Sequence, residues 1–187
     1  MPTILTHPAV PIAAGLALGG KRIPGRLMAI GVIASIVPDL DVLAFRLGIA
    51  YAAPFGHRGF SHSILFALML GALAVLAAPG LRVRRPIAGL FVFLATLSHG
   101  LLDMLTTGGM GVALFWPLSD TRYFAPWQVI EVAPLSLSRV LGPRGLAVLL
   151  SELKWVWLPA LAGGTCLAIV RWIRVLPFVS RALSGRG

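Results

Sequence analysis

The chain of 187 residues contains a single cysteine, Cys166, and only six acidic residues. One cysteine excludes an intramolecular disulfide and any metal site built from several thiolates. Charged residues make up 12% of the sequence, whereas a typical soluble domain has about 25%. These deficits argue against a soluble domain. A hydrophobic content of 58% and a mean hydropathy of +0.91 indicate an integral membrane protein.

Basic residues outnumber acidic residues, and the formal net charge is +10. In a soluble protein this balance would suggest nucleic-acid binding. Here the basic residues occur in short clusters between apolar runs, without a stripe of basic and aromatic residues, so we expect no nucleic-acid partner. We interpret the clusters as topology signals and as contacts for anionic headgroups, which makes membrane lipids the expected partners.

Apolar stretches separated by proline, glycine and basic residues predict an all-α, polytopic transmembrane bundle of about five spans. The expected spans are residues 8–20, 27–48, 62–79, 86–105 and 155–172. The first is short, and the second is interrupted by Pro38-Asp39-Leu40-Asp41. The apolar stretch 109–118 is too short to cross a bilayer, so we expect a re-entrant or interfacial segment before the last span.

The sequence predicts a single integral-membrane domain over residues 1–187, with metal-site helices in 1–118, an outer segment in 119–154, and the last span and basic tail in 155–187. The loops at Lys21 and Arg82 and the C-terminal tail carry ten Lys and Arg residues, and the other face carries six. The C-terminus is therefore expected in the cytoplasm, with the outer segment on the other side of the membrane. The acidic residues of the outer segment, Asp120, Glu131 and Glu152, are expected on a solvated surface.

In this topology every histidine and three aspartates fall near one membrane face: His7, Asp39, Asp41, His57, His62, His99 and Asp103. His99 and Asp103 are four residues apart and therefore share a helix face. Pro38 cannot continue a helical hydrogen-bond ladder and should open the chain beside Asp39 and Asp41. An aspartate at the centre of a span costs roughly 2.5–3.5 kcal/mol on insertion scales, so we expect a functional role.

Imidazole and carboxylate groups without thiolate suit Zn²⁺, Mn²⁺ or Fe²⁺. Seven candidates exceed the four ligands of tetrahedral zinc, so either two metals share the site or some residues orient the ligands and act as general base. We expect one or two divalent ions, zinc or manganese first, with candidate ligands His7, Asp39, His57, His62, His99 and Asp103. The candidate catalytic residues are Asp41 and Arg58, although Arg58 is equally well read as a juxtamembrane anchor.

These motifs resemble those of the bacterial inner-membrane metal-dependent hydrolases of the membrane-bound, LexA-regulated type. The motifs that carry the resemblance are His7, Pro38-Asp-Leu-Asp41, His57-Arg-Gly-Phe-Ser-His-Ser63, Ser98-His-Gly-Leu-Leu-Asp103 and Thr106-Thr107-Gly108. The resemblance covers about residues 1–118. It implies a membrane-bound, metal-dependent and hydrolytic protein, and it does not supply a substrate.

The leading hypothesis is hydrolysis of an amphiphilic small-molecule ester, first a phosphoester lipid, by metal-activated water. The alternative is a membrane transporter or metal-ion carrier. Transporters usually place their site near the bilayer midplane between repeated halves, whereas the candidate ligands here lie toward one face and no convincing repeat is present. A third reading is a non-catalytic scaffold with a structural metal. The sequence leaves the oligomeric state open.

Overall fold

The computed structural model describes residues 1–134 and 142–184, with side chains described as far as Arg174. Within these residues the regular structure is helical apart from two isolated β-bridges, which confirms the all-α prediction. Of the basic residues counted above, Arg139 and Arg186 lie outside the described residues, as does the side chain of Arg181.

In the described part of the chain, four helical stretches are long and apolar enough to cross a membrane, namely Gly25–Arg46, Ile64–Leu81, Arg85–Met104 and Pro143–Arg174, and a shorter apolar helix precedes them. The elements follow in the order α1 (Ala9–Leu18), α2 (Gly25–Ala34), η1 (Val37–Val42), α3 (Leu43–Arg46), η2 (Phe60–His62), α4 (Ile64–Leu81), α5 (Arg85–Met104), α7 (Pro143–Glu152), η3 (Leu153–Trp157) and α8 (Leu158–Ser184). The predicted helical bundle is therefore confirmed: four of the about five expected spans are long enough to cross a membrane, and the first corresponds to the shorter helix α1.

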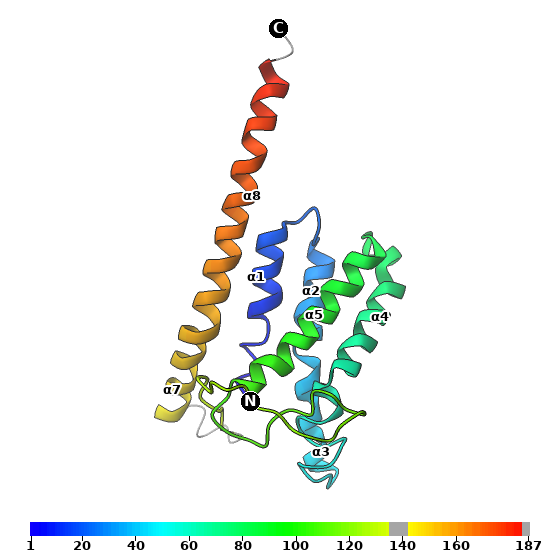
Figure 1. Ribbon diagram of the computed structural model, residues 1–187, viewed down its shortest axis with the longest axis vertical. Coiled ribbons are helices and arrows are strands. Elements are labelled where there is room, and N and C mark those ends of the chain that lie inside the picture. Colours follow the sequence, from blue (N-terminus) through cyan, green and yellow to red (C-terminus); the bar gives the residue numbers. More distant parts are fainter. Residues whose placement is uncertain (135–141, 185–187) are drawn as a thin grey trace.

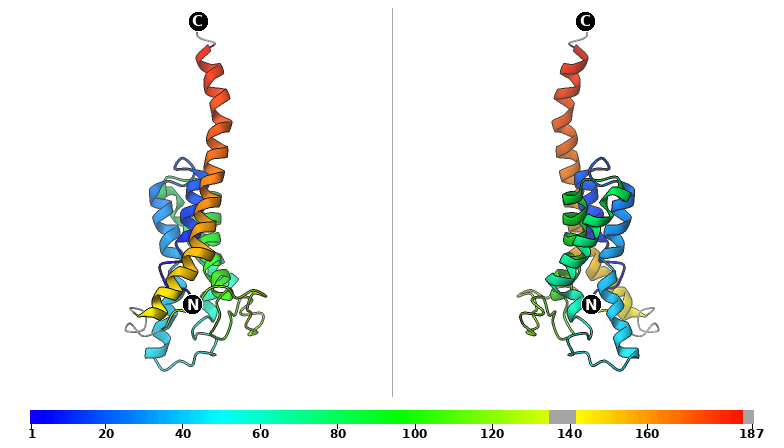
Figure 2. Two further views of the ribbon diagram at one scale, coloured as in Figure 1. Left: turned by 90° about the vertical axis from the view of Figure 1, so that its left-hand side faces the viewer. Right: turned by 90° about the vertical axis from the view of Figure 1, so that its right-hand side faces the viewer.

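Successive long helices run in alternating directions, with α4 packed along α5 and α1 packed along α8 (Figure 1). The N-terminus, α3, α7 and the irregular segment 105–134 gather at one end of the bundle, which we call the N-terminal end (Figures 1 and 2). The loops 19–24 and 82–84 lie at the opposite end, the basic end, and α8 projects beyond it. The candidate ligands lie on elements that meet near the N-terminal end.

Small residues bring the helices close together. A Cβ atom on Gly164 of α8 would lie 2.7 Å from the carbonyl oxygen of Ala13 in α1, and one on Gly31 of α2 would lie 2.3 Å from the Phe91 ring in α5. Lipid tails are as apolar as leucine, so helix association in a membrane depends on such close packing rather than on hydrophobic burial. These glycines therefore let α8 pack closely on α1, and α2 on α5.

Two irregularities differ from the simplest reading of the sequence. The last helix starts at Pro143 rather than near residue 155, because a π-helical turn, η3, precedes Pro159 and lets α7 continue into α8. The segment 109–118 forms no helix at the N-terminal end. Instead, Val112 pairs with Tyr123, and the Leu114 carbonyl accepts a hydrogen bond from the Ile64 amide (N···O 2.9 Å), so the segment packs beside the start of α4.

Candidate metal centre

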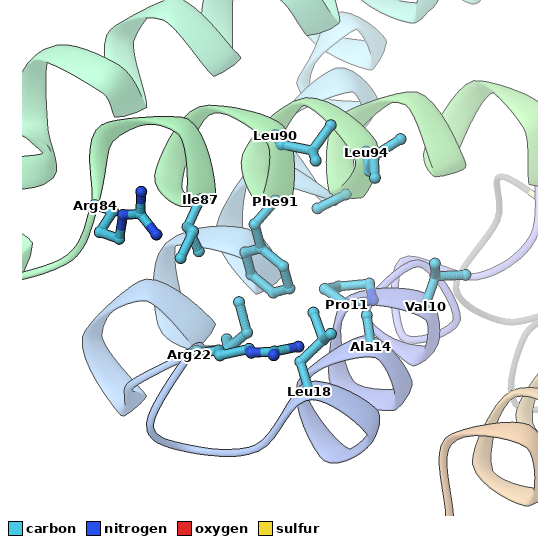
Figure 3. Close-up of a pocket in the computed structure, with 12 residues that line it drawn as sticks. Val10, Pro11, Ala14, Leu18, Arg22, Arg84, Ile87, Leu90, Phe91 and Leu94 are labelled. Carbon is cyan, nitrogen blue, oxygen red and sulfur yellow. The ribbon is translucent and has the colours of Figure 1, made fainter. Parts of the chain in front are cut away.

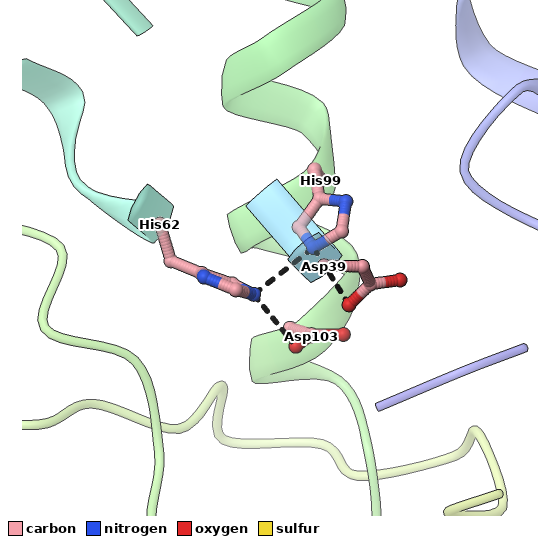
Figure 4. A group of neighbouring side chains, drawn as sticks. All are labelled: Asp39, His62, His99 and Asp103. Carbon is pink, nitrogen blue, oxygen red and sulfur yellow. Dashed lines mark hydrogen bonds and ion pairs between the residues drawn. The ribbon is translucent and has the colours of Figure 1, made fainter. Parts of the chain in front are cut away.

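Four buried side chains converge where three elements meet: Asp39 from η1, His62 from η2, and His99 and Asp103 from α5 (Figure 4). Each offers one ligand atom, and these atoms all lie within 4.8 Å of one another. The Nε2 atoms of His62 and His99 are 3.0 Å apart. His62 Nε2 lies 3.3 Å from Asp103 Oδ2, and His99 Nε2 lies 3.4 Å from Asp39 Oδ1.

The break after α2 orients His99. Pro38 has no N–H and interrupts the helical hydrogen-bond ladder. The Asp39 amide, which would donate to the Ser35 carbonyl in a continuous α-helix, donates instead to the Ile36 carbonyl, so the Ser35 carbonyl lacks its usual partner. His99 Nδ1 donates to that carbonyl at 2.7 Å. A carbonyl oxygen only accepts, so in the neutral ring the proton sits on Nδ1 and the lone pair of Nε2 faces the cluster.

Asp41 orients His62 in the same way. His62 Nδ1 lies 3.2 Å from Asp41 Oδ2 and 3.0 Å from the Ser61 hydroxyl, which itself donates to Asp41. The Nδ1 proton of His62 therefore points at acceptors, and Nε2 is left to the cluster. Two imidazoles whose outer N–H groups are held by a carbonyl and a carboxylate are the usual arrangement of histidines that bind metal.

The cluster contains buried polar atoms with no hydrogen-bond partner among the described residues. They are both carboxylate oxygens of Asp39, both of Asp103, and both ring nitrogens of His7, although Asp103 Oδ2 also forms an ion pair with Arg58 Nε at 2.8 Å. Unpartnered buried polar groups are costly. A cation among these oxygens and the Nε2 lone pairs would satisfy them together, so the residues present fit a divalent metal ion.

His7 lies beside the group of four. Its ring stacks on His99 with centroids 3.6 Å apart, and its Nε2 lies 3.5 Å from Asp39 and 3.9 Å from Asp103. Burial, with the neighbouring His99, lowers the pKa of His7 to about 3, so the ring is neutral and has a lone pair to offer. Burial also lowers the pKa of His62, but hydrogen bonding to Asp103 and Asp41 outweighs it and raises that pKa to about 9. The carboxylates thus create a field that favours positive charge.

Glu152 corrects the expectation of a solvated surface. Its side chain is buried at the junction of α7 and η3, where it accepts hydrogen bonds from the amide and the hydroxyl of Thr3. This contact fastens the segment that carries His7 to the last helix. Asp120 is exposed, and Glu131 pairs at the surface with Arg144 (2.8 Å), so the expectation holds for those two residues.

Asp41 and His57 form a hydrogen-bonded pair next to the group of four rather than within it. His57 Nδ1 donates to Asp41 Oδ1 at 2.5 Å, and Asp41 also accepts from the Arg58 amide and the Ser61 hydroxyl. The His57 ring lies edge-on to the His62 ring, with centroids 5.8 Å apart. It also lines a cavity of about 230 Å³ together with Tyr51 and Gly109.

Arg58 is fully buried, and its guanidinium contacts other residues of the protein rather than solvent. Nε lies 2.8 Å from Asp103 Oδ2, Nη1 donates to the Gly108 carbonyl at 3.0 Å, and Nη2 donates to the Thr106 hydroxyl at 2.9 Å. The backbone of Arg58 is left-handed, with φ at 59°, which is uncommon for a residue other than glycine. With all three nitrogens facing protein acceptors, Arg58 is placed to position Asp103 rather than to bind a substrate anion.

A family model described as "YdjM inner membrane protein" matches residues 1–176. Inner membrane protein YbcI of Escherichia coli strain K12 is 52% identical over 162 residues, which cover 86% of this chain and 94% of that protein. No solved structure shows significant similarity to the chain.

Proposed function

The chain belongs to the YdjM inner membrane protein family, and on that premise we propose that it is a membrane-bound, metal-dependent hydrolase of an amphiphilic ester. The observation that carries the proposal is the buried group of Asp39, His62, His99 and Asp103, whose ligand atoms all lie within 4.8 Å of one another and in which the Asp39 carboxylate has no hydrogen-bond partner among the described residues. Zinc and manganese are the first candidates, because the group offers imidazole and carboxylate without thiolate.

A divalent cation in such a site supplies Lewis acidity and makes a nucleophile available from water near neutral pH. Asp39, His62, His99 and Asp103 would hold it, with His7 at hand as a further ligand. Because these residues come from separate segments, they need not close the coordination sphere, and an open position is what separates a catalytic site from a structural one.

The Asp41–His57 pair supplies a proton acceptor. In the tautomer that donates Nδ1–H to Asp41, the His57 ring keeps Nε2 as a base, and the ring lines the cavity of about 230 Å³. An aspartate that holds a histidine in one tautomer is a recurrent device of general acid–base catalysis. Asp41 thus acts on two histidines, since it also orients His62.

The residues around the cluster at the N-terminal end favour a substrate located at the boundary between lipid and water. Irregular segments at the N-terminal end carry exposed apolar side chains, with Leu47 77%, Trp127 74% and Leu118 92% exposed. Tryptophan in particular favours the headgroup level of a bilayer. A phosphoester lipid, with its ester near the cluster and its tails in the membrane, is the first substrate to test.

The activity screen should use purified protein in micelles with lipid phosphates and soluble phosphoesters, with and without a chelator. We expect turnover of an amphiphilic ester that chelation abolishes, that His62→Ala lacks, and that His57→Gln lowers by roughly 10²–10⁴-fold, the usual contribution of a general base. If metal-loaded protein hydrolysed nothing but carried metal ions across liposomes, a metal-ion carrier would replace the hydrolase.

We also propose that the N-terminal end, with the cluster, faces away from the cytoplasm. The basis is the excess of Lys and Arg at the basic end and in the tail. A C-terminal fusion to a fluorescent protein should fluoresce, and a fusion to alkaline phosphatase should be inactive. The reverse pattern would place the cluster on the cytoplasmic side.

A further inference from the structure

An apolar groove runs between α1 and α5, from the basic end to Ala95, which is about one helical turn before His99. Its volume is about 420 Å³, and its walls are formed chiefly by Val10, Pro11, Ala14, Leu18, Phe91 and Leu94 (Figure 3). Among the described residues that line it, the only charged ones are Arg22 and Arg84, which come from the two loops of the basic end. The groove is therefore apolar along its length and cationic at one end.

The length of the groove corresponds to one leaflet. On the α5 side its lining extends from Arg84 to Ala95, which is about 16 Å at 1.5 Å per residue. The hydrocarbon core of a bilayer is about 30 Å thick, so half of it is about 15 Å. A lipid tail that starts beside the two arginines would reach the end of the groove near the bilayer midplane.

A second cavity adjoins the cationic end. It measures about 490 Å³, shares Leu18 and Arg22 with the groove, and is also lined by Lys21, Arg171 and Trp172. Arg171 is fixed there because it donates to the Leu16 and Ala17 carbonyls at the end of α1. Arg22 thus stands between an apolar groove and a basic cavity that carries an interfacial tryptophan.

No acidic residue balances these cations. All six acidic residues of the sequence lie in η1, in the last turn of α5 or in 120–152, away from the basic end. Within the described part of the chain, neither Arg22 nor Arg84 takes part in an ion pair with a carboxylate. A partner must therefore bring the negative charge, and basic pockets between membrane helices are known to receive anionic lipid headgroups.

We propose that this groove and cavity form one binding site for an anionic phospholipid, with an acyl chain between α1 and α5 and the phosphate beside Arg22. Arg84 and Lys21 flank the phosphate from the two sides. The site is separate from the metal centre, and its occupancy does not depend on hydrolysis.

Native mass spectrometry of the detergent-purified protein tests the proposal, with phosphatidylglycerol and phosphatidylcholine of identical acyl chains as probes. We expect wild-type protein to retain phosphatidylglycerol at least about tenfold more tightly. Arg22→Gln should abolish this preference, and Ala14→Phe, which fills the groove, should weaken binding of both lipids. Arg26→Gln is the matched control, because Arg26 is exposed at the same end but does not line the groove.

Equal retention of the two lipids by the wild type would overturn the proposal, and so would an Arg22→Gln variant that behaves like Arg26→Gln. Inorganic phosphate serves as a third probe. If it displaced phosphatidylglycerol at millimolar concentration, the cavity would be an anion site and not a lipid site. Metal content, measured on every variant, reports whether the bundle has folded, because the metal centre lies at the opposite end.

Discussion

Replacing Asp39 by alanine is expected to lower the affinity for divalent metal by more than about 100-fold, because losing a residue that merely orients a metal ligand already costs roughly 10–100-fold. Asp39 is buried, and neither of its carboxylate oxygens has a hydrogen-bond partner among the described residues. Its carboxylate is therefore available to a cation and to little else. The measurement is a competition titration of detergent-purified protein against a chromophoric chelator.

Asp120→Ala is the matched control for this change. It removes the same charge from an exposed position at the same end of the bundle. His99→Ala should behave like Asp39→Ala, because His99 supplies an imidazole held in place by the Ser35 carbonyl. If Asp39→Ala and Asp120→Ala bound metal equally well, the cluster would not be the metal site.

Arg58→Met is expected to destabilise the metal-free protein by about 3–5 kcal/mol, the usual cost of removing one partner of a buried ion pair. The change would strand the Asp103 carboxylate, which lies 2.8 Å from Arg58 Nε and is fully buried. It would also leave the Gly108 carbonyl and the Thr106 hydroxyl without that donor. Unfolding in mixed detergent micelles, with the metal removed beforehand, gives the free-energy difference.

Arg58→Lys separates charge from geometry. A lysine keeps the positive charge but cannot face Asp103, Thr106 and Gly108 with a planar fork, so we expect a loss intermediate between wild type and Arg58→Met. A variant Arg58→Met with unchanged stability and reduced turnover would instead support Arg58 as a catalytic residue, as the sequence analysis predicted.

The helices were predictable because the hydropathy pattern needs no tertiary information. Pro38 marked the break in the second span, and η1 begins one residue before it. The start of the last helix at Pro143 was not predictable in this way, because the apolar run expected to span the membrane begins only near residue 155. The π-helical turn Leu153–Trp157 joins α7 to α8, and the hydropathy pattern carries no sign of that turn.

The convergence of Asp39, His62, His99 and Asp103 was predictable from topology, since alternating spans bring the ends of neighbouring helices together. The sequence did not show which of the candidate residues would lie in the cluster and which would orient its ligands. Asp41 orients His57 and His62 through contacts that depend on the path of residues 47–62, which has no helical or strand periodicity. The role of the Ser35 carbonyl had one available signal, namely Pro38, which ends the helical ladder, so that the Asp39 amide bonds to Ile36 and not to Ser35.

Long-range contacts account for the remaining differences. Glu152 is 149 residues from Thr3 in the sequence, and no local pattern reveals that the two pair. Arg58 donates hydrogen bonds to Thr106 and Gly108, which are 48 and 50 residues away in the sequence and lie in irregular segments. Sequence reasoning finds residue types suited to a chemistry, whereas the side chains that hold those residues in place depend on the fold.

X-ray absorption spectroscopy of protein loaded with zinc tests the central claim most directly. The account predicts a first coordination sphere of nitrogen and oxygen only, with the multiple-scattering signature of at least two imidazoles, and the loss of one imidazole in His99→Ala. A sulfur ligand, or a spectrum without imidazole that His99→Ala leaves unchanged, would show that the metal binds elsewhere and would contradict the account.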